Sequence, residues 1–131
     1  METYKVGNGD QPIKLAVDID TLGLAASRAI VLIVASTDTG KAVAHSKDAT
    51  GDIAKKIIGK ASELEGKRLS VFTRIDLIGT DEERKREAER TTATYQLEGG
   101  IDGNLKFGDS RKIVNDEFTR IFLHKPIDLI G

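Results

Sequence analysis

The sequence predicts an all-β protein: a single-domain antiparallel β-sandwich, or a partly open barrel, of about seven to eight strands with one possible short helix. Short segments in which apolar and polar residues alternate recur along the chain. Clusters of glycine, aspartate and asparagine separate these segments at spacings of roughly ten residues, which is typical of sandwiches. We expect one domain over residues 1–131, because a chain of 131 residues can bury one sizeable core.

The composition is that of an ordinary globular protein, with 39% hydrophobic and 31% charged residues. The 20 basic and 21 acidic residues interleave and give a net charge of -1. This balance favours neither nucleic acid nor an acidic membrane as a partner. The chain contains no cysteine, which excludes disulfides, thiolate metal sites and a cysteine nucleophile.

The first residues predict a flexible arm and an intracellular location. Residues 1–11 are polar and contain glycine, without the basic start and apolar stretch of a signal peptide. The longest apolar run, residues 29–35, is too short to cross a bilayer. We therefore expect a soluble protein of the cytoplasm, or of a particle assembled there, with no membrane partner.

Two strands and a hairpin are predicted in the first third of the chain. Residues 13–20 alternate as a half-buried strand does, with Ile13, Leu15, Val17 and Ile19 on the inward side. Residues 29–36 are continuously apolar, which predicts a central strand buried on both faces, after a connection over residues 21–28. Residues 37–41 contain Asp38 and Gly40, a turn that leads into a returning strand.

The middle of the chain contains one ambiguous segment and one clear strand. Residues 53–66 have apolar residues at helical spacing, but an interior glycine and a pair of isoleucines oppose a helix, so helix and strand both remain open. Residues 67–78 alternate cleanly and predict a strand. Its inward side chains are Leu69, Val71, Thr73, Ile75 and Leu77.

Residues 79–91 are a highly charged loop without a large apolar residue. Thr80 and Glu83 have the spacing of a capping box, and a short helix here could bury only Ala88. Such a segment is solvated, disordered or packed against a partner. Residues 92–100 predict a strand through Ala93, Tyr95 and Leu97, and the chain closes with one or two further strands.

The sequence IDLIG occurs twice, within residues 74–79 and again within residues 126–131. Aligning residues 60–79 with 112–131 also matches Arg68 with Arg120 and the inward apolar positions. Strand periodicity alone generates much of this likeness. Duplication of a half-domain is the second interpretation, although true repeats extend further.

The motifs that usually carry catalysis fail in this sequence. The segment before Lys41 resembles a phosphate-binding loop, but Ala35 replaces its first glycine and Ala42 its final hydroxyl. The two histidines, His45 and His124, are isolated and are expected at the surface. Neither G-x-S-x-G nor H-E-x-x-H is present. We expect no enzyme activity and no cofactor.

Five polar residues are weak candidates for a cation site. Two carboxylates two residues apart on a strand face the same side, and a glycine-rich turn further along supplies more oxygen ligands. Neither group has the spacing of an EF-hand loop, and turns favour these residues for local reasons. We therefore assign no metal site, and the candidates are Asp18, Asp20, Asp102, Asn104 and Asp109.

The sequence favours a non-enzymatic structural or assembly subunit that packs in a homo-oligomer or a larger protein complex. The apolar final strand would be an exposed edge that strand addition by a neighbour could cover. The expected interface residues are Ile78, Ile127, Leu129 and Ile130. Small sandwich subunits of this kind occur in phage-tail-like and injection-type particles, an analogy of fold only. The alternatives are a ligand- or calcium-binding module that uses loops at one end, and a small enzyme.

Overall fold

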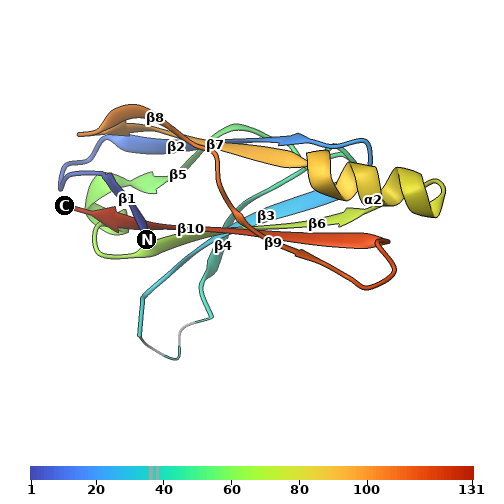
Figure 1. Cartoon of the computed structure of the whole chain (residues 1–131). Helices are drawn as coiled ribbons and strands as arrows, with labels where there is room; N and C mark the ends of the chain where they lie inside the picture. Colours follow the sequence, from blue (N-terminus) through green and yellow to red (C-terminus); the bar gives the residue numbers. More distant parts are fainter. Residues whose placement is uncertain (36, 38) are drawn as a thin grey trace.

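The computed structural model describes residues 1–35, 37 and 39–131 and consists of two β-sheets packed face to face (Figure 1). This confirms the predicted all-β sandwich, although the described residues form ten strands instead of seven or eight. The elements are β1 (Glu2–Lys5), β2 (Pro12–Asp20), β3 (Leu24–Leu32), β4 (Lys41–His45), β5 (Ile53–Lys60), α1 (Ala61–Leu64), β6 (Arg68–Asp76), α2 (Asp81–Arg90), β7 (Thr92–Gly100), β8 (Gly103–Phe107), β9 (Arg111–Val114) and β10 (Arg120–Ile130).

The larger sheet has the strand order β1-β10-β6-β3-β4, and β9 pairs with the first half of β10. The smaller sheet has the order β5-β2-β7-β8. All pairs are antiparallel except β1 with β10, which run parallel. Helix α2 lies at one end of the sandwich, as Figure 1 shows.

The core lies between the two sheets and follows the predicted alternation closely. On β2, β6 and β7 every side chain expected to face inward is buried. Thr73 is the polar member of this set, and its hydroxyl lies 2.7 Å from that of Ser27 on β3, so both buried hydroxyls are satisfied. The fully buried inward residues include Ile13, Leu15, Leu69, Val71, Ile75, Tyr95 and Leu97.

Strand β3 departs from the prediction in both its position and its burial. It begins at Leu24, within the expected connection, and ends at Leu32. Its side chains alternate between buried and solvent-facing, and Ile33 and Val34 beyond it are exposed. The expectation of burial on both faces is wrong, because none of the described elements forms a further layer over the outer face of the larger sheet. The returning strand β4 confirms the hairpin, while the turn role of Asp38 lies outside the described residues.

The N-terminal segment is a strand of the larger sheet and not a flexible arm. Residues 2–5 form β1, and Tyr4 and Val6 are completely buried. The Tyr4 hydroxyl donates to the carbonyl of Gly103 and accepts from the amide of Gly100 at 2.9 Å. The prediction was wrong because the alternating apolar pair is short and flanked by polar residues.

The C-terminal strand β10 is not an exposed edge, since β6 pairs with one side of it and β9 and then β1 with the other. Ile127 and Leu129 are buried in the chain's own core, so their predicted interface role is wrong. Pro126 is tolerated in this strand because it lies between the residues that pair with β9 and those that pair with β1.

The ambiguous segment contains both kinds of structure. Residues 53–60 form β5, which pairs irregularly with β2, and α1 is a single helical turn that buries Ala61 and Leu64. The charged segment contains α2, whose capping box of Thr80 and Glu83 is present as predicted. The helix covers the core through Ala88 and, unexpectedly, through Glu87.

The two IDLIG segments lie at opposite ends of one antiparallel strand pair, β6 with β10. Arg68 near the start of β6 binds Asp128 near the end of β10, with 2.7 Å between Nε and Oδ1. Arg120 at the start of β10 binds Asp76 at the end of β6, at 2.9 Å. The repeat therefore places one ion pair at each end of the strand pair. This arrangement agrees with both interpretations of the repeat, strand periodicity and duplication of a half-domain.

Candidate functional site

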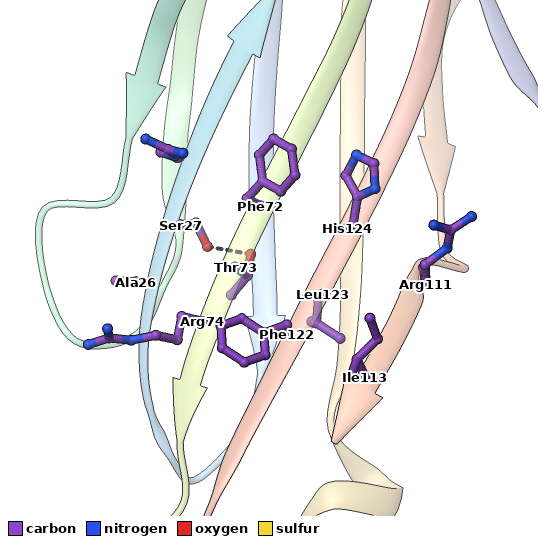
Figure 2. A pocket seen from close by; sticks show the side chains of 11 residues that line it. Ala26, Ser27, Phe72, Thr73, Arg74, Arg111, Ile113, Phe122, Leu123 and His124 are labelled. Carbon is purple, nitrogen blue, oxygen red and sulfur yellow. Dashed lines mark hydrogen bonds between the residues drawn. The ribbon is translucent and has the colours of Figure 1, made fainter. Parts of the chain in front are cut away.

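A groove crosses the outer face of the larger sheet, which no second layer covers in the part of the chain that the structure describes. Its volume is about 680 Å³, within the range of ordinary ligand sites. Figure 2 shows its side chains projecting from neighbouring strands. We call it the arginine–aromatic groove and define it by Arg28, Phe72, Arg74, Arg111, Phe122 and His124.

Strand pairing places these side chains in two rows across the sheet. In the first row Arg28 of β3 is beside Phe72 of β6, then His124 of β10 and Arg111 of β9. In the second row Arg74 is beside Phe122. Every one of these residues has the outward phase of its strand, opposite to the core.

The aromatic centre of the groove is the pair Phe72 and His124. Their rings are parallel within 1°, with 4.5 Å between centroids, a stacked arrangement. Burial lowers the pKa of His124, and the nearby charges of Arg111 and Arg68 lower it further, so the ring is neutral at pH 7. Its Nε2 lies 3.3 Å from the hydroxyl of Ser70.

Positive charge surrounds this aromatic centre. The Arg28 guanidinium lies 5.9 Å from the Phe72 ring centroid, a cation–π contact. Arg28 and Arg111 make no salt bridge within the described part of the chain, whereas Arg74 lies 3.7 Å from Asp76. No carboxylate lines the groove among the described residues.

A second surface feature is an apolar patch beside α2, which we call the end patch and define by Leu22, Leu24 and Ile78. These side chains are 73%, 54% and 65% exposed. Leu22 and Ile78 border the same shallow hollow. Gly23 allows the backbone before β3 to lie close to the end of β6. A Cβ at this position would lie 2.8 Å from the Asp76 carbonyl oxygen, so only glycine permits the close approach.

Glu87 anchors α2 next to the end patch. Its carboxylate accepts the amide of Leu22 at 2.8 Å and the side chain of Arg90 at 2.7 Å. Burial by itself raises the pKa of Glu87, but the hydrogen bonds from Leu22, Arg90 and Thr21 outweigh burial and lower it. The carboxylate is therefore ionised at neutral pH and fixes the helix against the connection between β2 and β3.

The exposed side of α2 carries both signs of charge in blocks. Asp81, Glu82 and Glu83 form an acidic first turn, and residues 84–86 are basic. Glu82 and Arg86 are exposed and make no salt bridge in the part of the chain that the structure describes.

The five candidate cation ligands are not brought together. Asp18 and Asp20 share the exposed face of β2, and Asp20 lies 3.5 Å from Arg90. Asp102 accepts the amide of Lys5, Asn104 accepts from Gln96, and the carbonyl of Asp109 accepts from Lys125. No three His, Asp or Glu side chains converge as metal ligands among the described residues.

Sequence reasoning placed some of these residues but missed the groove. His45 and His124 were expected at the surface: His124 is half-buried in the first row, and His45 is exposed on β4, in register with Arg28 at the end of that row. Of the expected interface residues, Ile78 and Ile130 are exposed, Ile130 to 39%. In the sequence, the outward-facing positions of these strands are rich in arginine and phenylalanine. These positions could be joined into one groove only once the order of the strands in the sheet was known.

The chain matches no protein-family model, no curated protein and no solved structure. Within the described residues, neither helix has the length and apolar character that crossing a membrane requires.

Proposed function

We propose that the protein is a non-enzymatic assembly subunit that packs through the end patch against a second copy of itself. The observation that carries the proposal is a group of three large, highly exposed apolar side chains: Leu22 and Ile78 border one hollow, and Leu24 pairs in register with Asp76, two residues before Ile78. Isolated exposed apolar residues are ordinary, but a contiguous group rimmed by polar residues is typical of an interaction surface. Glu83 and Glu87 supply part of this polar rim.

The charge pattern of α2 supports a second copy as the occupant. A two-fold axis perpendicular to α2 would set the two helices antiparallel, so that the acidic first turn of each lies beside basic residues 84–86 of the other. Glu82 and Arg86 are exposed charges of α2 that make no salt bridge among the described residues, and they can pair in this way. Electrostatic pairing of this kind sets the orientation of the contact, while apolar burial supplies most of the affinity.

The test is sedimentation velocity across a wide range of protein concentrations, supported by light scattering. We expect wild-type protein to dimerise and Ile78→Asp to remain monomeric, because a charge would be buried in the interface. The matched control is Ile57→Asp, since Ile57 is 54% exposed but lies on β5 of the other sheet. Ile130→Asp is expected to dimerise normally, since Ile130 ends β10 next to the C-terminus, which lies at the opposite end of the sandwich from α2 (Figure 1).

A charge exchange on α2 tests the geometry separately. Glu82→Arg and Arg86→Glu should each weaken the dimer, and the double variant should restore it, because every helix then carries both exchanged partners. Wild-type protein that is monomeric at about 1 mM would exclude a contact worth even about 4 kcal/mol. Equal loss of dimer in the Ile57→Asp control would also contradict the proposal.

A further inference from the structure

The arginine–aromatic groove attracts anions, because its uncompensated charge is positive. Three guanidiniums line it and no carboxylate does so among the described residues. Arg28 and Arg111 have no salt-bridge partner in that part of the chain. The guanidinium group is suited to phosphate and carboxylate because its N–H donors match two oxygens at once.

The groove also offers apolar and aromatic contact to a ring. Phe122 is 45% exposed and Ile113, its neighbour on β9, is 58% exposed. The stacked pair Phe72 and His124 lies in the adjoining row, and Figure 2 shows these rings on the same face as Phe122. A flat ligand ring placed here would contact aromatic side chains and arginine side chains together, both of which favour π systems.

The surroundings limit how large the ligand can be. Arg28 and Arg111 are separated by three inter-strand intervals, a span of about 14 Å. Along the strands, ion pairs lie at both ends of the face: Arg120 binds Asp76, two residues after Arg74, and Arg68 binds Asp128 beyond the first row. The positive charge that makes no salt bridge is therefore confined to the first row, which suits a compact ligand.

The groove does not suit a second copy of this chain in an isologous contact. A two-fold arrangement would place the same arginines of both copies against one another, which is unfavourable. This separates the groove from the end patch, where the charges of α2 are self-complementary.

We propose that the arginine–aromatic groove binds a small aromatic anion, that is, a flat ring that carries a phosphate or a carboxylate. Arg28 and Arg111 bind the anionic group from either side of the first row. Phe72, Phe122 and His124 contact the ring. The site is additional to the assembly surface and does not require it.

The experiment titrates the full chain with matched pairs of probes, by calorimetry and by amide chemical shifts. Adenosine monophosphate is compared with adenosine, and naphthoate with naphthalenemethanol, so that each pair differs only in the anionic group. At least one anion should bind at least about tenfold more tightly than its neutral counterpart, the range of one charge-assisted hydrogen bond. The pair with the larger ratio of anion affinity to neutral affinity shows whether a phosphate or a carboxylate is favoured.

The decisive variant is Arg28→Gln with Arg111→Gln, which removes two exposed charges that make no salt bridge among the described residues. We expect it to weaken binding at least about tenfold. The control is Lys56→Gln with Lys106→Gln, which changes the net charge equally but lies on β5 and β8 of the other sheet, and it should bind as wild type does. Ile78→Asp should also bind normally, which keeps this proposal distinguishable from the assembly proposal.

Four outcomes would overturn the proposal. The first is no binding of either anion at millimolar concentration, and the second is equal binding of the neutral probes. The third is inorganic phosphate that binds as tightly as adenosine monophosphate, since the ring would then contribute nothing. The fourth is oligothymidylate that binds at least about tenfold more tightly than the nucleotide and perturbs amides beyond the groove, the behaviour of a single-stranded nucleic-acid site.

Discussion

Replacement of Tyr4 tests whether the N-terminal segment is part of the core. The side chain is completely buried, and its hydroxyl joins Gly103 and Gly100. Truncating a buried aromatic side chain costs about 3–5 kcal/mol, and losing its hydrogen bonds adds to this, so Tyr4→Ala should cost about 4–6 kcal/mol. Tyr4→Phe keeps the ring but removes two partly buried hydrogen bonds, to the Gly103 carbonyl and from the Gly100 amide, which should cost about 1 kcal/mol.

Urea denaturation followed by far-UV circular dichroism measures these costs, because the chain contains no tryptophan. With a slope of about 2 kcal/mol per molar, Tyr4→Ala should lower the midpoint by about 2–3 M. If Tyr4→Ala does not fold, the milder variant Tyr4→Phe still gives a measurable change in stability. The control is Thr3→Ala, an exposed position on the same strand, which should change stability by less than about 0.5 kcal/mol. If Tyr4→Ala were as stable as the control, residues 2–5 would not be a strand of the core, and the prediction of a flexible arm would be correct.

Two further predictions concern the anchoring of α2 and a close backbone approach. Glu87→Gln should destabilise the protein by about 1–2 kcal/mol at pH 7, because it weakens hydrogen bonds to an ionised acceptor, whereas exposed Glu89→Gln should be neutral. The pKa of Glu87 is lowered below 4.5, so its contribution to stability is complete above that pH and is lost as the pH falls through the folded pKa. The denaturation curves of wild type and Glu87→Gln should therefore converge in acid. Gly99→Ala should cost more than about 3 kcal/mol in urea denaturation, because φ is +102° and a Cβ would lie 2.1 Å from the Pro12 carbonyl oxygen. Gly103→Ala, at φ +70° with open space around it, should cost only about 1–2 kcal/mol, and equal costs would contradict this explanation.

Alternation along a strand was enough to predict the core-facing residues of β2, β6 and β7. The side chains of Val17, Thr73 and Tyr95 all lie where period two places them. The capping box of α2 was also predictable, because it depends on two residues one helical turn apart. These features are local, and local chemistry specifies them.

The groove was not predictable, because it depends on which strands lie side by side. Arg28, Phe72 and Arg111 are neighbours only through the order β9-β10-β6-β3, which brings together segments that are distant in the sequence. The same limit explains the errors on Ile127 and Leu129. Their strand resembled an exposed edge until β1, from the other end of the chain, was known to pair with it.

Only part of the end patch could be predicted from the sequence. The sequence selected Ile78 because it breaks the polar outward phase of its strand. It gave no reason to join Ile78 with Leu22 and Leu24, since these residues follow a different strand. The close approach at Gly23 that unites them is a property of the folded backbone.

The two ion pairs between β6 and β10 help to fix the register in which these strands pair. Alternation opposes a slip of one residue, because that slip turns every core side chain to solvent. It does not oppose a slip of two residues, which preserves the inward phase. Such a slip separates Arg68 from Asp128 and Arg120 from Asp76 at the same time. The two charge pairs are each worth no more than about 1 kcal/mol in stability, yet together they distinguish the native pairing from its nearest competitor.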